Sequence, residues 1–174
     1  MKMGGAWHLT KRFLGSLRPG GPRRHDVAWV ASVLAADEMR LWRRMYGPDR
    51  RHSVAIAREV DRRLGDAATG PVLAAALLHD VGKVDAGLRT WGRVVATMSG
   101  LVAGPGTAVA WADGKGFTRR VGLYLQHPRL GGDMLEMIDS DPLTVAWTRQ
   151  HHLPESDWTV DPEIARVLHE VDDD

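Results

Sequence analysis

Cysteine is absent from this chain of 174 residues. Its absence excludes a disulfide scaffold, a metal site with thiolate ligands and a cysteine nucleophile. The chain also lacks an excess of charge of either sign, because 23 lysine and arginine side chains are matched by 22 acidic ones. A net charge of +1 gives no reason to expect a nucleic-acid polymer or a membrane surface as the partner. At this length a single domain can bury a hydrophobic core without cross-links.

Long hydrophobic runs are scarce, and the two that occur favour the helices of a soluble fold. Residues 27–36 follow a basic stretch, as in a secretory signal, but their apolar spacing continues beyond Glu38, which is typical of a soluble helix. Residues 94–112 carry no charge and are long enough to cross a membrane. Three glycines and Pro105 interrupt this run and predict a helix, a turn and a second short apolar segment. We therefore expect a cytoplasmic protein without a membrane-spanning helix.

The first 26 residues are interpreted as a basic arm. They contain six lysine and arginine side chains and no acidic residue before Asp26. Seven glycine and proline residues punctuate the stretch, so we expect at most one short helix, around residues 7–17. Such an arm could bind an anion or a partner, but a solvated extension packed through Trp7 is the simpler interpretation. Residues 27–174 are expected to form one domain.

Apolar residues recur at helical spacing along almost all of that domain, and no alternating strand pattern occurs. We therefore predict an all-α fold. Gly-Pro and Asp-Pro sequences mark several helix starts. Glu38 lies on the apolar stripe of the first helix, where we expect it to be partly buried and paired with an arginine. The expected helices span approximately residues 27–45, 50–64, 72–80, 88–101, 118–126, 130–138, 142–152 and 162 onward.

Histidine stands out in the composition, because most of the eight histidines lie on apolar helix faces or at helix ends. His52 shares the apolar stripe of its helix at a spacing of four residues. The adjacent His79 and Asp80 follow seven consecutive apolar residues, 72–78. Buried polar side chains of this kind must be paired with neighbours or must bind something. Five histidines and two aspartates share this situation: His52, His79, Asp80, His127, His151, His152 and Asp172.

A lone buried histidine is most often a satisfied part of a core, but seven such polar side chains favour metal binding. One or two divalent cations would satisfy all of them at once, whereas a core would have to pair each one separately. Imidazole with carboxylate suits iron, manganese, zinc, nickel or cobalt better than calcium or magnesium. Seven candidates exceed what one tetrahedral zinc ion can use. We therefore predict two divalent transition-metal ions, with iron or manganese before the others.

Three short motifs resemble the HD-domain metal-dependent phosphohydrolases. The sequence HDVGK at residues 79–83 is similar to the HDxGK signature of that family. The sequence RHSVA at residues 51–55 resembles its first histidine motif, and Asp172 stands where its last aspartate is expected. The resemblance covers roughly residues 27–172 and implies a helical HD-domain bundle with the metal site at its centre.

Two further motifs resemble the binuclear branch that includes the HD-GYP cyclic-dinucleotide phosphodiesterases. One is His127-Pro128 with the two glycines at 131–132, and the other is the pair His151-His152. The sequence LPESDW at residues 153–158 stands in place of the glutamate and the Gly-Tyr-Pro loop of that branch, which argues against cyclic di-GMP as the substrate. The segment between Asp80 and His127 is also longer, with residues 91–115 as the insertion.

The resemblance also implies a role for each matched residue. His52, His79, Asp80 and Asp172 would hold one metal ion. Asp80 would bridge to a second ion, and Lys83 would lie near the substrate phosphate. The ligands implied for the second ion are His127, His151 and His152. For Lys83 the alternative is a cation that stabilises the end of its helix.

The function implied is that of a metal-dependent phosphohydrolase. We expect a phosphodiesterase that hydrolyses a nucleotide or a cyclic dinucleotide through a metal-activated hydroxide, with Asp80 and Lys83 as catalytic residues. The expected partner is a small phosphorylated, nucleotide-derived substrate, and a homodimer is a possible assembly. Two alternatives remain: a di-iron HD-domain oxygenase acting on a small diol or phosphonate, and a non-catalytic module that binds a nucleotide or metal.

Overall fold

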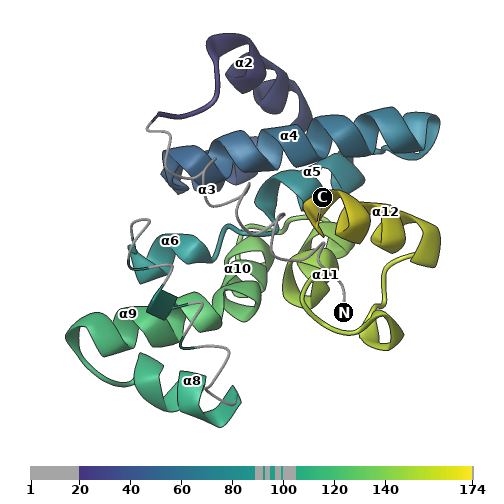
Figure 1. The fold of residues 1–174 in the computed structure, drawn as a ribbon. Helices are drawn as coiled ribbons and strands as arrows, with labels where there is room; N and C mark the ends of the chain where they lie inside the picture. Colours follow the sequence, from purple (N-terminus) through teal and green to yellow (C-terminus); the bar gives the residue numbers. More distant parts are fainter. Residues whose placement is uncertain (1–19, 89–91, 93–94, 97–98, 100–104, 174) are drawn as a thin grey trace, which may run out of the picture.

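Helices make up the regular structure of this protein (Figure 1). The computed structural model describes residues 20–88, 92, 95–96, 99 and 105–173. No strand occurs among them, so the predicted all-α class is confirmed for this part of the chain. The elements are α2 (Arg24–Val33), α3 (Ala36–Arg44), α4 (Gly47–Leu64), η1 (Gly65–Ala67), α5 (Gly70–Leu78), α6 (Lys83–Ala86), α8 (Pro105–Ala112), α9 (Gly116–Leu125), α10 (His127–Glu136), α11 (Pro142–Gln150), η2 (Glu155–Asp157) and α12 (Pro162–Asp173).

The central helix is α5, which packs against α4 and α11 and also contacts α2 and α3. Its seven residues 72–78 are all apolar and all buried. A helix that is apolar on every side is stable only inside a protein. The main core surrounds α5, with Trp42, Val60 and Leu168 among its fully buried members. Because α5 ends at Leu78 within this core, the polar residues that follow it, His79 and Asp80, lie in the interior of the protein.

A second, smaller core lies beside the first. It joins Ala86 and Leu88 to Val121 of α9, with Trp111 of α8 packed against it. The α8–α9 hairpin thereby attaches to α6, and α9 leads directly into α10 (Figure 1). The hairpin therefore fixes where α10 begins.

The first predicted helix is wrong in one respect, because residues 27–45 form two helices. The chain is extended at Leu34 and Ala35, between α2 and α3. The carboxylate of Glu38 accepts hydrogen bonds from the backbone N–H of Ala35 and the hydroxyl of Ser140. The prediction of an arginine partner is therefore also wrong. Glu38 is buried, and its carboxylate caps the start of α3.

Other helix boundaries also differ from the prediction. Pro128 lies within the first turn of α10, where a proline costs no hydrogen bond, so α10 begins at His127 and not at residue 130. For the same reason Pro48 lets α4 begin at Gly47. The helices expected over residues 7–17 and 88–101 lie wholly or mainly outside the described residues. None of the helices described here has the length and apolar character needed to span a bilayer.

Truncation of the central helix tests its place in the core. Leu77→Ala should lower the free energy of unfolding by about 3 kcal/mol, because the fully buried side chain leaves a cavity. Met137→Ala is the control, since 82% of that side chain is exposed and its loss should have little effect. Urea unfolding followed by circular dichroism measures both. Equal stability of the two variants would contradict the central position of α5.

Candidate metal centre

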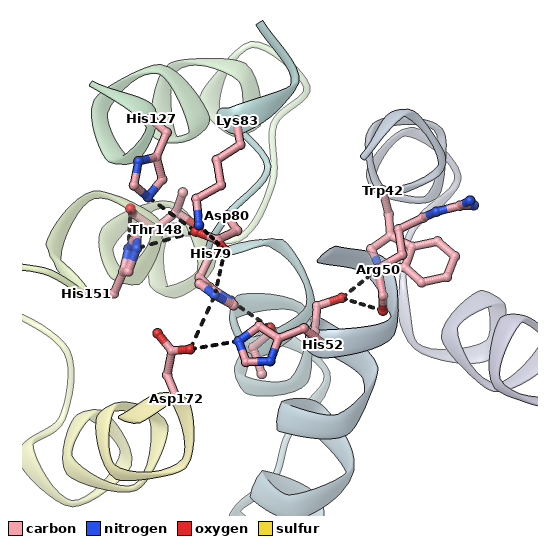
Figure 2. Close-up of polar contacts among 12 residues, drawn as sticks. Trp42, Arg50, His52, His79, Asp80, Lys83, His127, Thr148, His151 and Asp172 are labelled. Carbon is pink, nitrogen blue, oxygen red and sulfur yellow. Dashed lines mark hydrogen bonds and ion pairs between the residues drawn. The ribbon is translucent and has the colours of Figure 1, made fainter. Parts of the chain in front are cut away.

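All seven residues that the sequence singles out lie around one point, where the ends of several helices meet. Figure 2 labels all of them except His152. Six of them form two groups of three, and in each group the potential ligand atoms lie within 4.8 Å of one another. Asp80 lies between the groups. The first group consists of His52, His79 and Asp172, and the second of His127, His151 and His152.

The first group joins α4, the end of α5 and α12. Asp172 Oδ1 lies 3.2 Å from His52 Nε2 and 3.8 Å from His79 Nε2. His79 is buried, whereas 35% of the His52 side chain is exposed, so His52 lies at the rim. The apolar stripe of α4 thus places His52 at the boundary of the core and not within it.

The second group joins the start of α10 to the end of α11. His127 and His151 are buried, and His152 is exposed to solvent. The rings of His151 and His152 lie 4.1 Å apart, centroid to centroid, and the ring of His127 lies 5.5 Å from that of His151. Three imidazoles from two helices therefore share one small space.

Asp80 presents a different oxygen to each group. Its Oδ1 lies 3.2 Å from His127 Nε2 and 3.9 Å from His151 Nε2. Its Oδ2 lies 3.5 Å from His79 Nε2 and 2.5 Å from the ammonium nitrogen of Lys83. A buried carboxylate between two sets of ligands is in the position of a bridging ligand.

Backbone carbonyl groups orient the three buried imidazoles. The Nδ1–H of His79 donates to the carbonyl of Ala76, and that of His151 donates to the carbonyl of Thr148. In the same way His127 donates to Tyr124, at 2.7 Å. Each carbonyl belongs to the last turn of a helix, where backbone carbonyl groups can accept hydrogen bonds from side chains. Because a carbonyl can only accept, Nδ1 carries the proton and Nε2 presents a lone pair.

Those three Nε2 atoms are buried and have no hydrogen-bond partner. His127 Nε2 lies close to Asp80 Oδ1, but not in a hydrogen-bond orientation. Lone pairs of nitrogen and oxygen thus confront one another in a buried space, an arrangement that costs free energy unless a cation lies between them. Imidazole nitrogen whose opposite N–H is held by a carbonyl is the usual form of a metal-bound histidine. The residues present therefore fit a metal ion.

Protons do not compensate for most of these lone pairs. Burial, reinforced by the neighbouring imidazoles, holds the pKa of His151 well below its ordinary value. Burial also lowers the pKa of His127, because it outweighs the attraction of Asp80. His79 is different: burial opposes its charge, but the carboxylates of Asp80 and Asp172 raise its pKa to about 9. In the absence of metal, His79 carries a proton that a metal ion would displace.

Gly82 allows α10 to approach Asp80. A Cβ atom at this position would overlap the carbonyl oxygen of His127 and lie 2.6 Å from the backbone nitrogen of Gly131. On the other side, a Cβ on Gly131 would lie 3.0 Å from the nitrogen of Gly82. The backbones therefore cross in direct contact, which explains the glycine in the HDVGK sequence and places His127 beside Asp80.

A pocket in the described part of the chain lies elsewhere. Its volume is about 340 Å³, and its lining includes Glu38, Gly70 and Ser140. It opens at the start of α5, whereas His79 follows the end of that helix, about 13 Å further along. The metal centre is therefore a packed cluster of side chains and not part of this pocket.

Sequence reasoning missed Tyr124. Its carbonyl orients His127, and its ring lies 5.7 Å from the His127 ring and 5.6 Å from the Lys83 ammonium. The spacing of three residues before a histidine at a helix end could have indicated the carbonyl contact. His169, which the face of α12 excludes from the centre, lies instead against Trp158 and Asp173.

Comparisons of the chain with models of protein families, with curated proteins and with solved structures gave no match. The resemblance to HD-domain proteins therefore stays a prediction from the motifs of the sequence.

The stability of the metal-free protein should depend on pH in both directions. His127 and His151 bind protons more readily when unfolded, so stability falls below pH 6.5, by at most about 1.4 kcal/mol per pH unit and histidine. His79 has a raised pKa, so its contribution is present below pH 6.5 and is lost as the pH approaches about 9. Calorimetry in EDTA should show a maximum near neutrality. A melting temperature that does not decline on the alkaline side would contradict the assignment of His79.

A side chain at position 82 should move the second group of ligands away from Asp80. Gly82→Ala should lower the free energy of unfolding by about 2 kcal/mol and weaken metal binding, because α10 must move away from Asp80. Gly70→Ala is the control, since a Cβ there meets no atom within 4 Å. Thermal unfolding and metal titration measure the two effects. Unchanged metal binding in Gly82→Ala would show that the close crossing is not needed.

Proposed function

We propose that this protein is a binuclear metal-dependent phosphohydrolase of the HD-domain type, and that it is a phosphodiesterase acting on a nucleotide or a cyclic dinucleotide. The observation that carries the proposal is the set of three buried Nε2 atoms without hydrogen-bond partners around the carboxylate of Asp80. The order of the motifs along the chain supports it, because the same seven residues match the binuclear branch of that family.

Each group of three would hold one ion together with one oxygen of Asp80. Oδ2 belongs with His79 and the first group, and Oδ1 belongs with His127, His151 and the second group. Nitrogen and oxygen are the only ligands available, since the chain has no cysteine. That donor set suits iron or manganese, and also zinc, nickel or cobalt.

The chemistry of phosphate-ester hydrolysis suits such a centre. When bound, two ions that share a carboxylate supply Lewis acidity and an activated water molecule. The chain itself adds Lys83, whose ammonium is a cation beside the centre that can contact a phosphate oxygen. Although burial opposes this charge, the carboxylate of Asp80 raises the pKa of Lys83, so the side chain stays protonated.

Access for a substrate is from the rim of the centre. His52 is 35% exposed and His152 is exposed, whereas the other three histidines are buried. A phosphate group would therefore meet the proposed centre at these two side chains first. Lys83 and Asp172 have similar small exposed fractions, 15% and 14% of the side chain.

Hydrolysis is favoured over oxidation by two residues. The second histidine of the pair, His152, belongs to the second group of ligands, and Lys83 supplies a charge that suits a phosphate. The alternatives are an oxygenase acting on a small diol or phosphonate and a non-catalytic module that binds a nucleotide or metal.

Substitution of Asp80 and Lys83 tests the proposal. The substrates are cyclic dinucleotides, nucleoside mono- and triphosphates and an aryl phosphodiester, each assayed with manganese and with iron. Asp80→Ala should abolish hydrolysis and metal retention, because both groups lose the carboxylate that they share. Lys83→Ala should keep the metal but lower kcat about a hundredfold, as expected for the loss of one charged contact to the transition state. Lys115→Ala, which removes an exposed lysine, is the control.

Three results would contradict the proposal. Hydrolysis by Asp80→Ala at the rate of the parent would exclude a bridging role. Oxygen consumption by the iron-loaded protein, without release of phosphate or a linear dinucleotide, would favour the oxygenase. Absence of turnover on the whole panel, with the metal bound, would favour a binding module.

A further inference from the structure

We propose that Lys83 is a tethered cation that occupies the carboxylate of Asp80 when metal is absent, and that it moves onto the ring of Tyr124 when metal binds. This inference rests on the metal centre of the proposed function. It adds a competition between a side chain and the metal, in which Lys83 stabilises the metal-free protein and weakens metal binding.

The position of the Lys83 ammonium carries the first step. Its nitrogen lies 2.5 Å from Asp80 Oδ2, the oxygen that belongs with the first group of ligands. His79 Nε2 lies 3.5 Å from the same oxygen. An ammonium and a divalent ion repel each other, so the two compete for one buried carboxylate oxygen. Metal binding at Oδ2 must therefore displace Lys83.

The ring of Tyr124 lies close enough to bind the displaced ammonium of Lys83. Its ring centroid lies 5.6 Å from the Lys83 nitrogen, within the range of a cation–π contact. The ammonium thus already lies at the outer range of this contact while it binds Asp80, and rotation of the long side chain can release Oδ2 and bring the ammonium closer to the aromatic face. The ring also lies beside His127, so the new position remains next to the centre.

Energetic coupling between the two cations is reciprocal. A carboxylate buried without a cation is costly, so Lys83 stabilises the metal-free chain. The same contact must be broken before metal binds, so it reduces the affinity for metal. Removal of Lys83 should thus change the two quantities in opposite directions, which a purely structural or purely catalytic lysine would not do.

The experiment compares Lys83→Met, Lys83→Gln and Lys115→Met with the parent protein, using manganese titration by calorimetry and thermal unfolding in EDTA. Lys83→Met should bind manganese at least about tenfold more tightly, since the ion no longer competes with a tethered charge. Its metal-free form should melt about 5 °C or more below the parent. Lys83→Gln should bind manganese as tightly as Lys83→Met. Its metal-free form should melt between Lys83→Met and the parent, because the amide can still donate a hydrogen bond to Asp80. Lys115→Met should match the parent.

Variants of Tyr124 test the second position. Tyr124→Leu should weaken manganese binding about threefold when Lys83 is present, because the ammonium loses its place over the ring. In the Lys83→Met background the same change should have no effect. Tyr124→Phe keeps the ring and should restore the affinity of the parent.

Unchanged or weaker manganese binding in both Lys83 variants would overturn the inference while leaving the metal centre intact. A parent protein that binds no manganese would instead overturn the proposed function. If Lys83→Met does not fold, Lys83→Gln decides the question by the same titration. An effect of Tyr124→Leu that persists without Lys83 would exclude the ring as the second position.

Discussion

The C-terminal ends of three helices meet at the carboxylate of Asp80. In the last turn of each helix, one backbone carbonyl accepts a hydrogen bond from a histidine. The helices are α5, α9 and α11, and the histidines are His79, His127 and His151. The C-terminal end of a helix carries partial negative charge, so three such ends beside Asp80 create a strongly negative point in the interior. A cation is the natural occupant of that point. The rest of the fold serves to bring these three ends together.

Two features of the chain make this convergence possible. The apolar helix α5 is buried on every side, so His79 and Asp80 enter the interior at its end. Gly82 then lets the backbone of α10 pass in contact, which carries His127 to the other side of Asp80. The centre is thus built into the packing of the core. A metal ion bound there would stabilise the folded chain, because the unfolded chain has no such site.

Helical periodicity and the position of histidines at helix ends predict most of this arrangement. The all-α class and the grouping of seven residues follow from patterns within single helices, and those patterns survive folding. The break between α2 and α3 was missed because the carboxylate of Glu38, which caps α3, also binds the hydroxyl of Ser140, 102 residues away along the chain. Tyr124 was missed for a similar reason: its contact with Lys83 arises only when α9 packs against α6. Contacts between separate helices cannot be predicted from the local sequence, whereas the spacing of residues within one helix can.

The central claim is that the carboxylate of Asp80 joins two groups of three ligands into a centre for two ions. The most direct test is the metal content of the protein after loading with manganese or iron and removal of excess metal by gel filtration. Elemental analysis should find close to two equivalents per chain. One equivalent or fewer in fully loaded protein would contradict the claim.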